Sequence, residues 1–195
     1  MAVFKLLESD NPILKVKLED CNPELNRQEI KDNLIETMQH YEGIGLSANQ
    51  IGVMERVFVM YNHVETKQII ACFNPKIIKE GEEKVLIDEG CLSFPGLWVK
   101  VNRPETIEVE YEDENGEKVQ RELYGLQSRI FQHEYDHMEG SNFTEKVSKL
   151  KLDMAIKKHD STMMIHDFFV GIELFSLPVR AVLCDLERIA ANAIA

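Results

Sequence analysis

The segment Gln132-His133-Glu134-Tyr135-Asp136-His137 contains the pattern His-Glu-x-x-His, which predicts the central element of the fold. Residues four positions apart lie on one face of an α-helix, so both histidines can reach one metal ion. The glutamate follows the first histidine and is placed to serve a water molecule rather than the metal itself. The segment therefore predicts a helix that supports metal-assisted hydrolysis.

The residues around this segment predict a helix that begins near Leu126. Its apolar face would run through Leu126 and Ile130 and would carry His133 and His137 toward the interior. An unpaired polar group in an apolar interior is costly, and binding a metal would remove that cost. The pattern also arises by chance on exposed helices, so it does not establish a metal site alone.

A third ligand is expected because catalytic sites of this kind usually combine three protein ligands with an open position. The chain has four cysteines, Cys21, Cys72, Cys91 and Cys184. Cys91 lies in Glu-Gly-Cys-Leu-Ser, just after a predicted strand, and a thiolate is a strong ligand for first-row metals. Cys72 and Cys184 lie within apolar runs, which is typical of small buried side chains. Cys91 is therefore the predicted third ligand.

The chain before the central helix is dominated by predicted strands. Residues 26–40 predict a helix that ends at Gly43, and a glycine-rich loop, GIGLSANQIG, follows it. Asn115-Gly116 predicts a hairpin turn between two strands. The remaining runs are rich in Val, Ile, Tyr and Phe, and they predict strands at residues 56–62, 68–74, 76–80, 83–88, 97–101, 106–112 and 119–125.

Length and composition indicate one globular domain, with 195 residues of which 44% are hydrophobic and 29% charged. The predicted fold class is α+β, with antiparallel and mixed β-sheets packed around the central helix. Within the single domain 1–195, residues 1–145 would form the catalytic core. Residues 146–195 would add a helical C-terminal region, whose apolar runs are shorter than the about 20 residues that span a membrane.

Charge and cysteine usage narrow the function classes. The net charge of −12 disfavours DNA binding, which usually needs a basic excess. The chain has no Cys-x-x-Cys pair and begins without an apolar signal segment, so we expect a reducing, cytoplasmic location. The oligomeric state is left open.

Residue patterns alone leave two other functions open. An endopeptidase with the same helix would draw a third ligand from downstream, where His159 and His166 are the next histidines. It would keep metal and activity after Cys91→Ala. A non-enzymatic, metal-stabilised binding module would use the C-terminal region as its interface and would unfold when its metal is removed.

Three segments in this order resemble the signature motifs of peptide deformylases. They are GIGLSANQ at 43–50, EGCLS at 89–93 and QHEYDH at 132–137. The resemblance spans about Gly43 to Gly140. The family removes the formyl group from the N-terminal formyl-methionine of nascent chains, and this resemblance implies the same activity here.

The resemblance also implies the roles of the site residues. Cys91, His133 and His137 would bind one divalent metal ion, commonly ferrous iron in this family, with zinc, nickel or cobalt as substitutes. Glu134 would be the general acid and base. Gln50 and the backbone N–H of Leu92 would stabilise the oxyanion.

The first motif agrees with a role beside a ligand. Gly43 and Gly45 allow the backbone to approach a ligand closely, and Gln50 is a neutral donor suited to a developing oxyanion. The family usually has Ala at the position of Ser47 and more often Leu at that of Met138. We expect both changes to be tolerated.

The substrate site is expected beside the central helix. By similarity, the methionine side chain would enter a pocket lined by Ile44, Leu126 and Ile130. The extended peptide would pair with backbone around Ile44 and Gly90, and Gly45 would also contact the substrate. A basic stretch would dock the chain at the ribosome, or else form a solvated helix face, and its residues are Lys146, Lys149, Lys151, Lys157 and Lys158.

Overall fold

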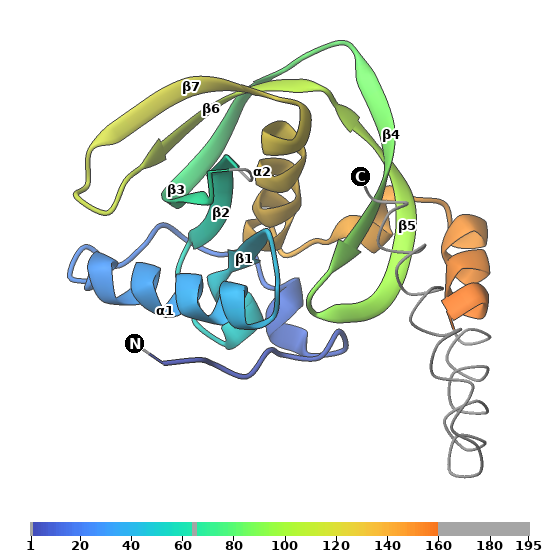
Figure 1. Ribbon diagram of the computed structural model, residues 1–195, viewed down its shortest axis with the longest axis horizontal. Coiled ribbons are helices and arrows are strands. Elements are labelled where there is room, and N and C mark those ends of the chain that lie inside the picture. The colour runs from blue at the N-terminus through green and yellow to red at the C-terminus, as the bar shows by residue number, and fades with distance from the viewer. Residues whose placement is uncertain (1, 64–65, 160–195) are drawn as a thin grey trace. The chain divides into compact units, whose positions relative to one another are not determined.

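Two antiparallel sheets surround the helix that carries the His-Glu-x-x-His pattern (Figure 1), in a computed structural model that describes residues 2–63 and 66–159. This arrangement confirms the predicted α+β class. The first sheet has the order β1-β2-β3-β6-β7 and consists of β1 (Gly45–Ser47), β2 (Val57–His63), β3 (Gln68–Glu80), β6 (Thr106–Glu112) and β7 (Lys118–Tyr124). The second sheet pairs β4 (Lys84–Cys91) with β5 (Phe94–Pro104), and helices α1 (Arg27–His40) and α2 (Gly125–Met138) pack with the sheets.

The five-stranded sheet is covered by a helix on each face. Strand β2 is buried on both sides, because Phe58 and Met60 pack with residues of α2 while Val57 and Val59 pack with residues of α1. A strand buried on both faces is expected to lack the alternation of apolar and polar residues. The sequence of β2 shows this uniform apolar character, and the strand fixes α1 and α2 on opposite sides of one sheet.

Two predicted runs, 68–74 and 76–80, form the single strand β3 instead of two strands. Pro75 lies between them and has no N–H to donate. Pairing of β3 with β6 shifts register between Phe73 and Lys76, and Asn74 has a φ of 51°. The proline is accommodated at a bulge, so it bends the strand without ending it.

Helix α1 ends at His40, as predicted, but Gly43 is not the residue that ends it. Glu42, with a φ of 56°, takes the left-handed conformation that follows the helix. Gly43 instead donates its N–H to the carbonyl of Met38 at 2.9 Å. A Cβ at Gly43 would lie 2.7 Å from Leu92 Cδ1, so the glycine lies close to the β4–β5 turn.

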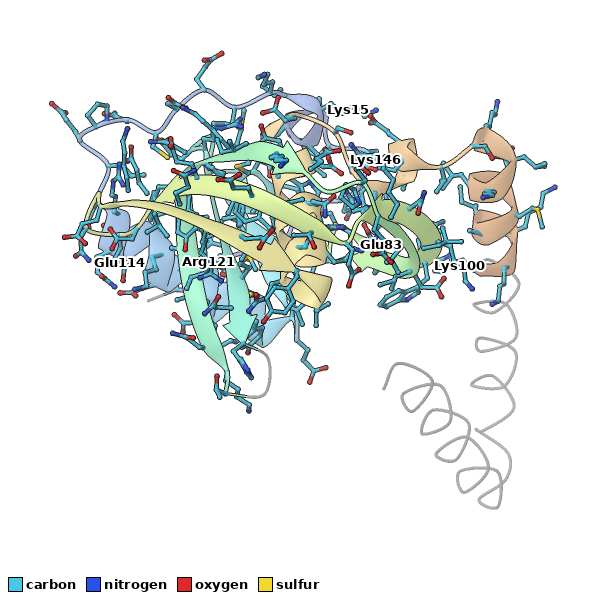
Figure 2. The ribbon with its side chains drawn as sticks, turned by 90° about the horizontal axis from the view of Figure 1, so that it is seen from above. Lys15, Glu83, Lys100, Glu114, Arg121 and Lys146 are labelled. Atoms are coloured by element: carbon cyan, nitrogen blue, oxygen red, sulfur yellow. The ribbon has the colours of Figure 1, made fainter. Side chains whose placement is uncertain are left out.

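The hairpin of β6 and β7 reaches back to α1. Gly116, with a φ of 82°, forms the predicted turn. Figure 2 shows Glu114 at the far end of this hairpin, where it pairs with Lys31 of α1. Arg27 of α1 donates to the backbone carbonyl of Asp113 at 3.0 Å, so side chains of one helix hold the hairpin tip.

The chain divides into two units after residue 152. The first unit covers residues 1–152 and the second covers 153–195. Residues 149–159 are helical, as the basic stretch predicted. The segment 166–195 lies outside the residues that the structure describes, and the division into a core at 1–145 and a C-terminal region stays a prediction. Among the described helices, none has the length and apolar character needed to cross a membrane.

Candidate metal centre

Cys91 at the end of β4 meets His133 and His137 of α2. One ligand atom from each residue lies within 4.8 Å of the others. Cys91 Sγ is 3.4 Å from His137 Nε2. Cys91 precedes the two histidines by more than forty residues, and the fold brings all three predicted ligands into one cluster.

A carboxylate contacts the ring nitrogen of His133 that is not left for the cluster. His133 Nδ1 lies 3.1 Å from Glu89 Oε2, which leaves the other ring nitrogen for the cluster. Burial would lower the pKa of His133, but hydrogen bonds with Cys91 and Glu89 outweigh it and raise the pKa to about 10. The same negative partners would favour a metal cation at this position.

His137 is wholly buried, with 0% of its surface exposed. Burial and the neighbouring His133 lower its pKa to about 3, so its imidazole is neutral and has a lone pair to share. Its Nδ1 has no hydrogen-bond partner in the part of the chain that the structure describes. Two imidazoles and one thiol form a donor set that fits a divalent first-row metal.

Glu134 points from α2 toward β1. Its Oε2 accepts a hydrogen bond of 2.6 Å from Ser47 Oγ. A Cβ at Gly45 would lie 2.4 Å from Oε1, so any side chain there would push the carboxylate out of this position. Burial raises the pKa of Glu134 above its ordinary value, although His133 and Ser47 act in the opposite direction. A buried carboxylate with a raised pKa is suited to exchanging protons.

Gln50 lies in the 3₁₀ turn η2 (Ala48–Ile51), and its amide orientation is fixed. The N–H of Ser47 donates to Gln50 Oε1 at 2.9 Å, so Nε2 must face the other way. That NH₂ group lies 3.3 Å from Cys91 Sγ and 3.2 Å from Ser93 Oγ. Leu92 occupies the turn between β4 and β5, directly after the cysteine.

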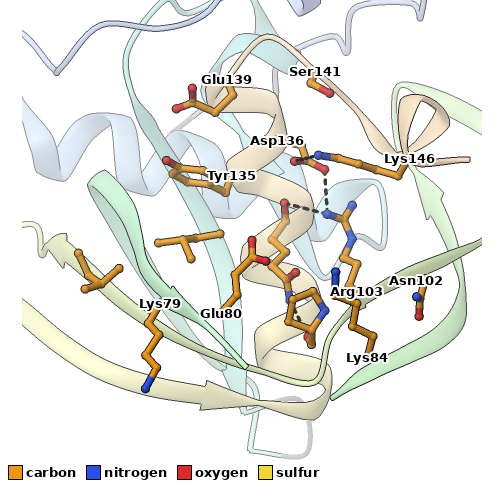
Figure 3. A pocket seen from close by; sticks show the side chains of 14 residues that line it. Lys79, Glu80, Lys84, Asn102, Arg103, Tyr135, Asp136, Glu139, Ser141 and Lys146 are labelled. Carbon is orange, nitrogen blue, oxygen red and sulfur yellow. Dashed lines mark hydrogen bonds and ion pairs between the residues drawn. The ribbon is translucent and has the colours of Figure 1, made fainter. Parts of the chain in front are cut away.

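A network of buried charges supports the cluster. Arg103 binds Glu89 through two hydrogen bonds of 2.7 and 2.9 Å, and Arg129 binds the same carboxylate at 2.7 Å. Arg103 and Lys146 both reach Asp136, each at 2.8 Å (Figure 3). Burial alone would raise the pKa of Glu89, but hydrogen bonds with His133 and Arg103 lower it well below its ordinary value. Glu89 is therefore a carboxylate that is charged and fixed.

The face of α2 opposite the histidines borders a polar hollow of about 510 Å³. Gln132, Tyr135 and Asp136 face this hollow, while His133 and His137 face the cluster. The period of the helix separates the two sets. Asp136 therefore links the hollow to the charge network that holds His133.

The predicted substrate residues divide into exposed and buried groups. Ile44 is 44% exposed and Leu126 is 51% exposed, whereas Ile130 is only 3% exposed and packs in the core. A Cβ at Gly45 would lie 2.9 Å from Ile130, and a Cβ at Gly90 would lie 3.1 Å from the Trp98 ring. Ile44 and Leu126 are thus exposed at the surface, while Ile130 is part of the core.

Sequence reasoning missed several residues that support the site. Glu89 belongs to the EGCLS segment, and its carboxylate beside a predicted ligand was an available signal. Ser47 belongs to the first segment, and the available signal was a serine at a position where the family usually has Ala. Arg103 and Arg129 gave no local signal, because their partners come from other elements.

The comparisons with known proteins agree with one another on a single family. The family model described as "Polypeptide deformylase" matches residues 3–153. A peptide deformylase of Rhizobium meliloti is 37% identical over 163 residues, which cover 81% of this chain and 92% of the relative.

Solved structures with the same fold include a peptide deformylase from Legionella pneumophila. It has a TM-score of 0.76 and 31% identity, with 85% of this chain and 98% of that chain covered. A peptide deformylase from Synechococcus elongatus in complex with actinonin has a TM-score of 0.75 and 32% identity. That match covers 80% of this chain and 86% of the other.

Proposed function

The chain belongs to the polypeptide deformylase family, and we propose that Cys91, His133 and His137 hold the metal with which it removes formyl groups from N-terminal formyl-methionine. The observation that carries these roles is the approach of the three ligand atoms to within 4.8 Å, beside a buried glutamate. A bound divalent metal lowers the pKa of water and polarises a carbonyl oxygen. Ferrous iron is the metal we propose from the family, with zinc, nickel or cobalt as substitutes.

Glu134 moves the proton in this proposal. Its carboxylate takes a proton from the water molecule whose oxygen joins the formyl carbon. The same group then returns the proton to the nitrogen as the carbon–nitrogen bond breaks. The products are formate and a peptide with a free amino group. The burial of Glu134, with 4% of its surface exposed, supports this role because it excludes competing solvent.

Gln50 and Leu92 would stabilise the oxyanion in this proposal. The Gln50 amide already faces the cysteine, since Ser47 holds its oxygen on the other side. Leu92 follows the cysteine in a turn, where its backbone N–H would lie beside the reacting carbonyl. Removing one donor of this kind typically lowers turnover by about 10²–10³.

The substrate would lie along the edge of the five-stranded sheet. Strand β1 is at that edge, and Gly45 lies in it. An extended peptide would pair with β1 and with the backbone at Gly90, as an added strand. Ile44 and Leu126, both about half exposed, would contact the methionine side chain, with Ile130 beneath it.

Formylated and acetylated peptides of one sequence test the proposed reaction. We expect release of a free amino terminus from formyl-Met-Ala-Ser and little from acetyl-Met-Ala-Ser. Equal cleavage of both peptides would contradict deformylation. Cleavage between internal residues would favour a metallopeptidase, the competing activity for this helix.

We also propose that the basic stretch after the core docks the enzyme at the ribosome in the cytoplasm, where formylated chains emerge. Lys149 and Lys151 are exposed on the helix at 149–159. Lys146 binds Asp136 and is therefore a weaker candidate for RNA phosphate. Full-length protein with Lys149→Glu and Lys151→Glu should lose cosedimentation with ribosomes and keep turnover of free peptides. Unchanged cosedimentation would contradict docking through these lysines.

A further inference from the structure

Ser47 makes a contact that its usual counterpart in the family, alanine, has no atom to make. It lies in β1, and 0% of its surface is exposed. Its hydroxyl lies 2.6 Å from Glu134 Oε2 and 3.3 Å from the Glu134 backbone carbonyl. Both potential acceptors belong to the residue proposed to move the proton.

The hydrogen bond distinguishes the two oxygens of the Glu134 carboxylate. Oε2 is engaged by the hydroxyl, while Oε1 lies beside Gly45, where an added Cβ would come within 2.4 Å. Oε1 therefore lies over the face of β1 that packs against α2, and β1 is the edge strand along which the substrate would lie. A hydrogen bond from a hydroxyl to a charged carboxylate is stronger than one between two neutral groups. Here it restricts rotation of the Glu134 side chain.

The backbone of Ser47 also fixes the orientation of the Gln50 amide. The Ser47 N–H donates to Gln50 Oε1 at 2.9 Å, which turns the Gln50 NH₂ group toward Cys91. This backbone contact is independent of the residue type at position 47. The hydroxyl is therefore what this chain adds to the common arrangement.

We infer that Ser47 is a positioning residue that holds Glu134 Oε2 and leaves Oε1 as the atom that takes up and returns the proton. This inference rests on the proposed role of Glu134. Correct placement of a reacting group matters more in the transition state than in substrate binding. Loss of the hydroxyl should consequently lower kcat more than it changes KM.

The test compares Ser47→Ala with Ser47→Thr, which keeps a hydroxyl. Ser128→Ala is the matched control, because Ser128 is a wholly buried serine of α2 whose hydroxyl binds Pro104 and Gln132. Each full-length, metal-loaded variant is assayed for kcat and KM on a formyl-methionyl peptide. Bound metal and thermal unfolding are measured on the same samples.

We expect Ser47→Ala to lower kcat roughly tenfold, with KM and bound metal unchanged. Ser47→Thr should recover most of kcat, and Ser128→Ala should match the parent. An unchanged kcat in Ser47→Ala would overturn the inference, as would an equal loss in Ser128→Ala or no recovery in Ser47→Thr. If Glu134→Gln abolishes turnover while Ser47→Ala leaves kcat unchanged, only this inference fails. If Glu134→Gln retains turnover, the proposed proton transfer fails as well.

Discussion

At the scale of single residues, Glu89 shows how this chain keeps a charge in its interior. The carboxylate is 5% exposed and contacts His133, Arg103 and Arg129. Removing one partner of a buried ion pair leaves the others uncompensated, which is more costly than the pair itself is stabilising. Glu89 therefore links the stability of the fold to the orientation of His133, a proposed metal ligand.

Glu89→Gln should weaken metal binding about 10–100-fold, because His133 loses the carboxylate that orients it. The same change should lower the free energy of unfolding by about 3–5 kcal/mol, since two arginines lose their shared partner. Chelator competition and urea unfolding measure the two effects. Asp88→Asn, at an exposed carboxylate next in sequence, is the control. Parental metal affinity in Glu89→Gln would argue against the orienting role.

The Glu134→Gln variant should keep its metal, because Glu134 is not one of the three clustered residues. Its kcat should fall roughly 10²–10⁴-fold, because the group proposed to transfer the proton is gone. Metal analysis and turnover of a formylated peptide on the same preparation provide the measurement. Glu122→Gln, at an exposed glutamate of β7, should behave like the parent. Substantial turnover in Glu134→Gln would exclude this side chain as the proton carrier.

At the scale of elements, different faces of helix α2 meet two different environments. Its Gln132, Tyr135 and Asp136 face a polar hollow, while His133 and His137 face the proposed metal. The N-terminal part carries the exposed Leu126 at one end and the buried Ile130 one turn later. The helix thus connects the surface proposed to contact the substrate with the residues proposed to bind the metal.

The β6–β7 hairpin gives a prediction about pH. A hydrogen bond with Lys31 lowers the pKa of Glu114 below its ordinary value of 4.5. Because the folded pKa is the lower one, this pair stabilises the fold fully above about pH 4.5 and loses its effect as pH falls through the folded pKa.

Glu114→Gln should therefore lower stability at pH 7 by about 0.2–1 kcal/mol, with the difference from the parent disappearing in acid. Chemical unfolding at a series of pH values from 7 to below 4 would measure the trend. Glu117→Gln, an exposed glutamate of the same hairpin, is the control. A difference that persists unchanged at the lowest pH would contradict the assigned ion pair.

At the scale of the whole molecule, the core does not depend on the metal ligands. The two apolar clusters are built from the sheet with α1 and α2, and none of the three ligands belongs to either. The charge network likewise joins β4, β5 and α2 directly. The fold should consequently persist when the metal is removed.

Chelation should abolish turnover and leave the circular dichroism spectrum essentially unchanged, and adding back a divalent metal should restore turnover. This outcome separates a catalytic metal from a structural one, since removal of a structural metal unfolds a protein. Dialysis against buffer without chelator provides the control. Loss of secondary structure on chelation would instead favour a metal-stabilised binding module.

The sequence by itself determined the features that depend on local spacing. Histidines four residues apart belong to one helix face, and this relation holds wherever the helix packs. Apolar runs and Asn115-Gly116 located most strands and the hairpin, because these preferences arise from neighbouring residues. The prediction divided β3 at Pro75, because local preferences do not reveal that a partner strand accepts a bulge.

Only the tertiary structure decided which distant groups meet. Strand pairing and helix packing bring the carboxylate of Glu89 to His133 and the hydroxyl of Ser47 to Glu134. Packing also leaves Leu126 exposed and Ile130 buried, although both belong to the face predicted to be apolar. The reason is that helical period and strand propensity act over a few residues, whereas side-chain contacts depend on register and on how whole elements pack.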